Sequence, residues 1–218
     1  MAIRSKILGT GHFVPERVVT NKDLEALMDT TDEWIQQRTG IKERRWISQE
    51  TGASDLAVPA THRALEMAGL TAKDIDAVIF ATLSPDYNFP GSAVLMTQHL
   101  GIPGVACLDI RNQCSGFVYG TQIADAWIRC GMYKHVLMIG AEVHSSGLDL
   151  TNRGRDVSVI FGDGAGVVIY GASDDDTGVL ATEVGADGAF AKELWLEAPG
   201  SRYLPRLTEG GELGSYAL

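Results

Sequence analysis

The sequence is poor in several features that would have fixed its class at once. It has three cysteines in 218 residues, Cys107, Cys114 and Cys130, an odd and small number that does not suit a disulfide framework. No Cys-x-x-Cys pair or His/Cys cluster suggests a metal site. There is no run of about 18 apolar residues, as a membrane-spanning helix requires, and no signal-peptide pattern at the start. We therefore expect a cytoplasmic protein without a metal.

Positive charge is also scarce. Lys and Arg together number 18 against 28 Asp and Glu, giving a formal net charge of −10. A chain of this charge is not expected to bind nucleic acid, which requires a basic face. The one local exception is residues 38–45, where four cations outnumber Glu43. This segment is either a solvated turn or a contact for phosphates or an acidic partner protein.

What is present is ordinary globular composition. Hydrophobic residues make up 45% of the chain and charged residues 21%, and no low-complexity tract suggests disorder. A chain of this length forms one large domain or two small ones.

Helical and extended patterns alternate along most of the chain. From periodicity and end signals we expect helices at 21–28, 32–37, 54–67, 92–100 and 115–130. We expect strands at 3–8, 75–83, 105–110, 136–141, 157–160, 167–172 and 179–185, the last two as a hairpin around 174–176. Such alternation predicts an α/β fold with a mostly parallel sheet and helices on both faces.

The strongest chemical signal is Cys114, which follows the strand at 105–110 and lies at or just before the start of a helix. Free N–H groups and the positive end of the helix dipole favour thiolate over thiol there. The alternative is a buried, inert cysteine, which is our interpretation of Cys107 and Cys130. Gly116 and Gly120 are poor helix residues and predict close approach by another element.

Two other stretches, taken alone, are best explained by a structural role. Residues 161–166, Phe-Gly-Asp-Gly-Ala-Gly, are too compact for a dinucleotide-binding loop and predict a tight turn before the strand at 167–172. Residues 29–41 are typical of an exposed helix with Trp34 in the core.

Together these stretches resemble the β-ketoacyl-acyl-carrier-protein synthase III family of thiolase-superfamily condensing enzymes. The motifs that carry the resemblance occur in the family's order at 9–11 with Pro15, 31–41, the Cys114 turn, 151–154, 161–166 and 186–188. The resemblance implies a thiolase-like fold. Residues 1–172 would form its N-terminal half, and 173–218 a hairpin and linker toward a C-terminal half beyond this sequence.

The resemblance also implies roles for individual residues. Cys114 would be the acyl-accepting nucleophile. Trp34 and Arg153 would enclose the adenine of coenzyme A, with Thr30 and Arg38 holding the nucleotide end.

Two further residues would belong to the acyl pocket. Phe89 would close the pocket of the partner in a homodimer. His144 replaces an aliphatic residue of the family and is either a pocket contact or a tunnel or surface residue. Residues 112–115, Asn-Gln-Cys-Ser, depart from the family's run of small residues, which leaves the acyl-chain preference open.

The implied reaction is a decarboxylative Claisen condensation between an acyl group from acyl-CoA and malonyl-acyl carrier protein, without a permanently bound cofactor or metal. The family's catalytic His and Asn have no counterpart here. None of the five histidines matches that motif: His12, His62, His99, His135 and His144.

Three hypotheses therefore stay open. The chain is a synthase, a non-condensing subunit or remnant that binds acyl-CoA, or an unrelated nucleotide-binding α/β module.

Overall fold

A computed structural model of the chain describes residues 4–196, which form two compact units. The sheet unit comprises residues 4–20, 43–145 and 161–184, and the small unit comprises 21–42, 146–160 and 185–196. The domain boundary predicted at residue 172 stays a prediction. The final part of its predicted linker, 197–218, lies outside the described residues.

The sheet unit is built on five strands in the order β1-β7-β6-β4-β5. β6, β4 and β5 pair in parallel, whereas β7 is antiparallel to both of its neighbours, β1 and β6. Four strands therefore point one way, and their carboxyl ends share one margin of the sheet, which we call the carboxyl edge. The strands are β1 (Ser5–Phe13), β4 (Ala77–Ala81), β5 (Ala106–Ile110), β6 (Val136–Val143) and β7 (Asp163–Ala172).

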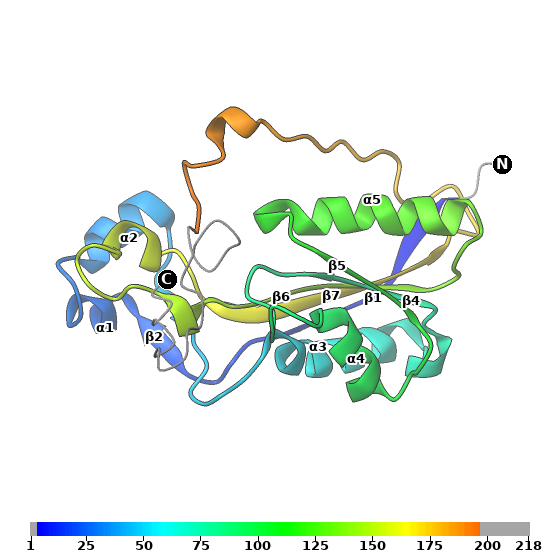
Figure 1. Cartoon of the computed structure of the whole chain (residues 1–218), viewed down its shortest axis with the longest axis horizontal. Coiled ribbons are helices and arrows are strands. Elements are labelled where there is room, and N and C mark those ends of the chain that lie inside the picture. Colours follow the sequence, from blue (N-terminus) through cyan, green and yellow to red (C-terminus); the bar gives the residue numbers. More distant parts are fainter. Residues whose placement is uncertain (1–3, 197–218) are drawn as a thin grey trace, which may run out of the picture. The chain divides into compact units, whose positions relative to one another are not determined.

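Helices cover both faces of this sheet, as the sequence predicts (Figure 1). α3 (Ala53–Ala68) and α4 (Ser92–Leu100) pack on one face, and α5 (Gly116–Arg129) packs on the other. Every residue of β4 is buried, because a strand covered on both faces has no side that meets water.

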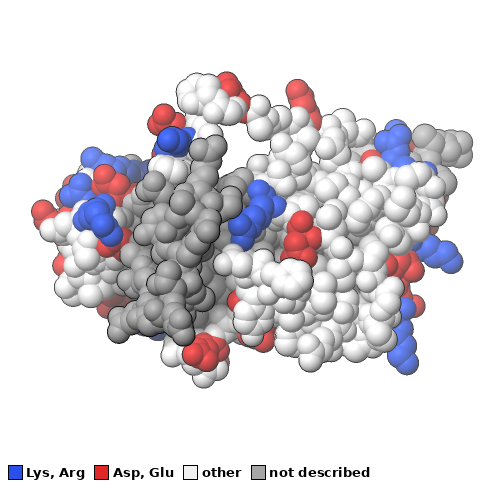
Figure 2. Space-filling view, viewed as in Figure 1, with Lys and Arg blue, Asp and Glu red and all other residues white. Residues whose placement is uncertain are grey.

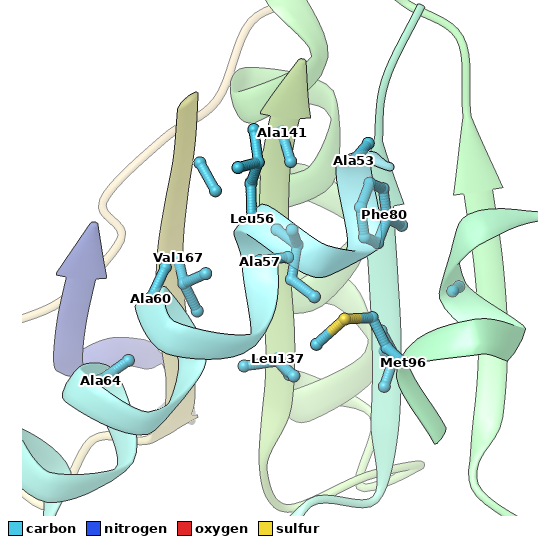
Figure 3. Close-up of a cluster of buried hydrophobic side chains, with 14 of the residues drawn as sticks. Ala53, Leu56, Ala57, Ala60, Ala64, Phe80, Met96, Leu137, Ala141 and Val167 are labelled. Atoms are coloured by element: carbon cyan, nitrogen blue, oxygen red, sulfur yellow. The ribbon is translucent and has the colours of Figure 1, made fainter. Parts of the chain in front are cut away.

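The core on the α3 side is made of small residues from the helix and larger ones from the sheet. Figure 3 shows the alanines of α3 directed at the sheet, where Phe80, Leu137 and Val167 meet them. Alanine side chains allow the helix to approach the strands closely, which strengthens dispersion contacts at native packing density.

Gly9 and Gly11 of β1 allow that approach. A Cβ atom at Gly9 would lie 2.3 Å from the carbonyl oxygen of Ala64, and one at Gly11 would lie 2.0 Å from that of Ala60. The backbone of α3 occupies the space of both missing side chains, so the Gly-Thr-Gly motif is a helix-packing motif in this structure.

The core on the α5 side joins Ala124 and Ile128 of the helix to Ile79, Met138 and Tyr170 of the sheet. The Tyr170 hydroxyl is 2.7 Å from Thr121 Oγ1. Burial raises the pKa of Tyr170, so the phenol stays neutral and able to donate a hydrogen bond.

The small unit contains α1 (Asn21–Glu25), α2 (Asp32–Thr39), the single turn α6 (Arg155–Ser158) and the 3₁₀ turn η4 (Gly188–Phe190). Thr31 caps α2 by accepting a hydrogen bond from the Trp34 amide at 3.0 Å. Gly40 ends the helix at φ 72°, a left-handed conformation that glycine adopts without strain.

Short elements complete the described chain. They are the two-stranded sheet of β2 (Val18–Thr20) and β3 (Glu43–Arg45), with the 3₁₀ turns η1 (Ala72–Asp74), η2 (Gln113–Ser115) and η3 (His144–Gly147). No helix among residues 4–196 is long and apolar enough to cross a membrane.

Three sequence-based expectations are wrong. Residues 157–160 do not form a strand, because 155–158 are the helical turn α6. Residues 179–185 are irregular, so no hairpin follows β7, which pairs with β1 and β6 instead. The motif at 161–166 is not a tight turn, because β7 already begins at Asp163.

Candidate functional site

Cys114 lies where the sequence places it, between β5 and α5. β5 ends at Ile110, Cys114 falls in the 3₁₀ turn η2, and α5 begins at Gly116. The turn is closed by Ser115, whose N–H and Oγ both donate to the carbonyl of Asn112, at 3.2 and 2.9 Å. Cys114 is exposed, and the thiol is therefore accessible at the carboxyl edge of the sheet unit.

The start of α5 is positioned by close packing on β4. A Cβ atom at the buried Gly116 would lie 2.8 Å from Cβ of Ala81, the last residue of β4. One turn later, a Cβ at Gly120 would lie 2.2 Å from Sδ of Met138. The predicted close approach is therefore confirmed, and it fixes the helix end that carries Cys114.

The other two cysteines are exposed as well, so the expectation that they are buried is wrong, but their surroundings differ from those of Cys114. Cys107 lies within β5, where burial raises the pKa of its thiol and the nearby Asp109 charge adds to the increase. Cys130 follows α5, and its Sγ is 2.7 Å from the carbonyl oxygen of Ala126 in the preceding turn. Neither stands at a helix start, so the structure singles out Cys114.

A carboxylate network that the sequence analysis missed organises the ends of β4 and β6. Glu142 accepts hydrogen bonds from the amides of Leu83 and Ser84 at 3.0 and 3.1 Å. It also accepts from the hydroxyls of Thr82 and Ser84 at 3.0 and 2.6 Å. A charged acceptor with several donors holds this loop firmly. The only sequence signal was an acidic residue inside an otherwise apolar strand.

The aspartate of the 161–166 motif, Asp163, has a structural role in this fold. It accepts hydrogen bonds from the amides of Ile47 and Ser145, both at 2.8 Å, and from the Ser145 hydroxyl. The buried carboxylate therefore ties three chain segments together where β7 begins.

His144 follows β6 at the same edge. Its ring lies edge-to-face on Phe161 with centroids 4.6 Å apart, and its Nε2 is 3.9 Å from the Glu142 carboxylate. Phe89, in contrast, is 90% exposed. A wholly exposed phenylalanine is a candidate for an interface or a pocket lid.

Trp34 and Arg38 are brought together in the small unit. The guanidinium carbon of Arg38 is 4.3 Å from the centroid of the Trp34 ring. Thr30 lies shortly before α2, and its hydroxyl is buried without a hydrogen-bond partner among the described residues. An unsatisfied buried hydroxyl is unusual, and a ligand that offers a polar group could satisfy it.

Arg153 is not placed over Trp34. Its Nε donates to the carboxylate of Asp149 at 2.6 Å, and its side chain is 80% exposed. Hydrogen bonds from Thr151 and Arg153 lower the pKa of Asp149 to about 2. The guanidinium over the indole beside Arg38 belongs instead to Arg155, at 4.9 Å, a residue that the sequence analysis did not single out.

Among residues 4–196, no group of three or more His, Cys, Asp or Glu residues could hold a metal ion. The chemistry of the described side chains is that of a thiol nucleophile and of cations around an indole.

Comparisons with known proteins agree on one family. Residues 108–188 match the family model described as 3-oxoacyl-[acyl-carrier-protein] synthase III. A β-ketoacyl-[acyl-carrier-protein] synthase III from Caldanaerobacter subterraneus is 46% identical over 200 residues, 92% of this chain and 60% of the relative. One from Oceanobacillus iheyensis is 47% identical, over 87% of this chain and 60% of the relative.

Solved structures give the same result. The synthase III structure from Thermus thermophilus matches with a TM-score of 0.85 at 40% identity, covering 92% of this chain and 61% of that one. The structure from Aquifex aeolicus matches with a TM-score of 0.81 at 45% identity, covering 85% and 59%. The chain therefore has the expected thiolase-like α/β fold and spans about 60% of the length of the relatives it matches.

Proposed function

Because the chain belongs to the β-ketoacyl-[acyl-carrier-protein] synthase III family, we propose that it carries the nucleophile of an acyltransferase that makes β-ketoacyl-acyl carrier protein. Acyl-CoA is the acyl donor, and malonyl-acyl carrier protein supplies the two-carbon extender. The proposal places the chain at the initiation of fatty-acid synthesis or of a related pathway, in the cytoplasm.

The observation that carries the proposal is the exposed Cys114 at the start of α5. Its sulfur attacks the thioester carbonyl, the new C–S bond forms, and the thiolate of coenzyme A leaves. The backbone N–H groups of the turn and of the first helical turn are donors for the oxyanion that develops on the carbonyl oxygen.

The second half-reaction forms the carbon–carbon bond. Malonyl-acyl carrier protein loses carbon dioxide, its carbanion attacks the acyl-cysteine carbonyl, and the Cys114 thiolate leaves. The family resemblance assigns enolate stabilisation to a His and an Asn without counterparts in this sequence. In the described part of the chain, no hydrogen bond or ion pair joins Cys114 to a histidine.

Coenzyme A is proposed to bind through Thr30, Trp34, Arg38 and Arg153. The indole offers a face for adenine, and the guanidinium groups suit phosphates. Trp34 and Arg38 are already in contact, whereas Arg153 must leave Asp149 to reach the base. Its exposed side chain allows that change.

The acyl pocket is proposed to use His144 and Phe89. His144 beside Phe161 and Glu142 places a polar ring at the carboxyl edge of the sheet unit. Phe89 would cover the pocket of the second subunit in a homodimer, which accounts for its exposure in a single chain.

Intact-protein mass spectrometry tests the proposal. The chain is incubated with acyl-CoA thioesters from acetyl to dodecanoyl, and we expect an adduct of the acyl mass. Cys114→Ala should abolish the adduct, whereas Cys107→Ala, the matched control, should retain it. An adduct that survives Cys114→Ala, or none with any thioester, contradicts the proposal.

A second readout separates the synthase from a non-condensing acyl-CoA-binding subunit. Malonyl-acyl carrier protein is added to the acylated chain, and released carbon dioxide is measured. Release that depends on prior acylation supports condensation, whereas a stable adduct without release favours the non-condensing alternative.

A further inference from the structure

The chain on either side of Cys114 is held against the end of β4. Before the cysteine, Ile110 pairs with Ala81 in the parallel ladder, and the Ile110 carbonyl accepts a hydrogen bond from the Thr82 amide at 3.3 Å. After it, Gly116 packs so closely that a Cβ atom there would lie 2.8 Å from Cβ of Ala81. The last residue of β4 and the residue after it therefore support the turn that carries Cys114.

Thr82 is held in turn by Glu142 of β6. The Thr82 hydroxyl donates to Oε2 of Glu142 at 3.0 Å. The same oxygen accepts from the Leu83 amide at 3.1 Å, and from the amide and hydroxyl of Ser84 at 3.1 and 2.6 Å. The Ser84 hydroxyl also accepts from the Val143 amide at 2.7 Å, which ties the loop back to β6. One carboxylate oxygen therefore binds donors from three successive residues.

An ionised carboxylate suits this position, because hydrogen bonds to a charged acceptor are about twice as strong as neutral ones. Charged side chains are sparse on the face of the sheet unit that Figure 2 shows. In the described part of the chain, Glu142 forms no ion pair with Lys or Arg, and its one contact of this kind is with Nε2 of His144 at 3.9 Å. Its charge is therefore met mainly by the donors of the loop after β4.

The reaction proposed for Cys114 depends on how the turn is placed. The thioester carbonyl must lie close to the sulfur while its oxygen meets backbone N–H groups of the turn and of the first turn of α5. A misplacement of about 1 Å can slow such a step about a hundredfold. Glu142 and Cys114 share no hydrogen bond in the described chain, so an effect of Glu142 passes through Thr82 and Ala81.

We propose that Glu142 is a positioning residue for acyl transfer to Cys114. By holding the loop after β4, it fixes the support of the cysteine turn, and with it the sulfur and the N–H groups that receive the oxyanion. The inference rests on the proposed acylation of Cys114, and adds to it a residue that does not touch the substrate.

Single-turnover acylation of the full chain by acetyl-CoA, quenched and followed by intact-protein mass, tests this role. Glu142→Gln keeps the shape of the side chain and removes its charge. The maximal acylation rate should fall about tenfold, whereas the acetyl-CoA concentration that gives half of this rate should change less than about twofold. This pattern is expected because the turn places the reacting atoms and does not bind the rest of coenzyme A.

Thr82 gives a second test in which Glu142 is kept. Thr82→Val removes the hydroxyl but retains the backbone bond to Ile110, and should slow acylation in the same way by a smaller factor. Thr82→Ser keeps a hydroxyl for Glu142 and should restore the rate of the unaltered chain. Circular dichroism and urea unfolding check that each variant is folded under the assay conditions. If Glu142→Gln does not fold, the two Thr82 variants decide.

Asp125→Asn is the matched control. Asp125 is a buried carboxylate of α5 that accepts from the amide and hydroxyl of Ser5 at 3.1 and 2.7 Å. Ser5 begins β1, so this contact lies at the edge of the sheet opposite to Cys114. Asp125→Asn should lower stability without slowing acylation. Equal slowing in Asp125→Asn and Glu142→Gln, or an unchanged rate in Glu142→Gln, overturns the positioning role.

Acylation of the unaltered chain separates the two proposals. If no thioester acylates Cys114 in the unaltered chain, the proposed function fails together with this inference. If the unaltered chain is acylated, and Glu142→Gln and Thr82→Val are acylated equally fast, the role of Glu142 alone is refuted.

Discussion

Asp149 holds the turn that carries Arg153. Its carboxylate accepts hydrogen bonds from the amide and hydroxyl of Thr151 and an ion pair from Arg153, which together lower its pKa to about 2. Because the pKa is lower in the folded chain than its ordinary value of 3.8, ionised Asp149 stabilises the fold fully at pH values above about 3.8. This contribution is lost as the pH falls through about 2.

The causes of that shift can be separated by substitution. The side-chain hydrogen bond from Thr151 is the largest single cause and that from Arg153 the next, so Thr151→Val and Arg153→Ala should each raise the pKa of Asp149 toward 3.8. Carbon-13 NMR titration of the Asp149 carboxyl measures both. If Arg153→Ala has the larger effect, the ion pair rather than the turn controls this carboxylate.

Single residues were predictable where their chemistry depends on local sequence. Cys114 lies at the predicted helix start, because a strand, a turn and a helix leave few other places for it. Arg155 could not be found in this way. Its contact with Trp34 joins segments more than a hundred residues apart, and α6 was interpreted as part of a strand.

The first turns of α5 link helix packing to the position of Cys114. Gly116 and Gly120 leave no space for a side chain against Ala81 and Met138. Overpacking a core costs about 1–3 kcal/mol, more than the roughly 1 kcal/mol that alanine gains over glycine in a helix.

Gly120→Ala should therefore lower the free energy of unfolding by up to about 2 kcal/mol, and Gly116→Ala should in addition slow acylation of Cys114. Urea unfolding and adduct formation measure the two effects. Gly140→Ala is the matched control, because a Cβ atom there meets nothing within 4 Å. Unchanged stability in Gly120→Ala would show that Met138 yields without cost.

Most elements around the sheet were predictable, because buried strands and capped helices leave clear patterns. The errors fall on short apolar segments. Residues 157–160 contain three β-branched residues, and a run of four does not distinguish a strand from a helical turn. Residues 179–185 contribute one backbone bond to the sheet margin, from the Val179 amide to the Ser5 carbonyl, but no strand.

The pairing of distant strands decides the architecture of the whole sheet unit. Directions within β4, β5 and β6 follow from the helices that connect them. The antiparallel direction of β7 and its place between β1 and β6 could not be predicted from the sequence. Periodicity in a single sequence does not show which distant strands pair.

Homodimer formation is a property of the whole molecule that we expect Phe89 to affect. If Phe89 lies in a homodimer interface, Phe89→Ala should cost about 2 kcal/mol of association, roughly a 30-fold increase in the dimer dissociation constant. Analytical ultracentrifugation over a range of concentrations measures it. Met132→Ala, which also removes an exposed apolar side chain, is the control and should leave the constant unchanged.

A monomer at all concentrations, with Cys114 still acylated, would contradict the role of Phe89. Equal weakening by both substitutions would show a loss of general surface hydrophobicity instead.

The place of β1 in the sheet has a consequence for biosynthesis. β1 leaves the ribosome before the other described elements, but its sheet neighbour is β7, which begins about 150 residues later, or about 8–30 s at ordinary translation rates. α3 emerges much earlier and packs on Gly9 and Gly11. During synthesis, α3 can therefore pack on one face of β1 before β7 exists. The backbone N–H and C=O groups of β1 stay unpaired, and accessible to chaperones, until β7 is made.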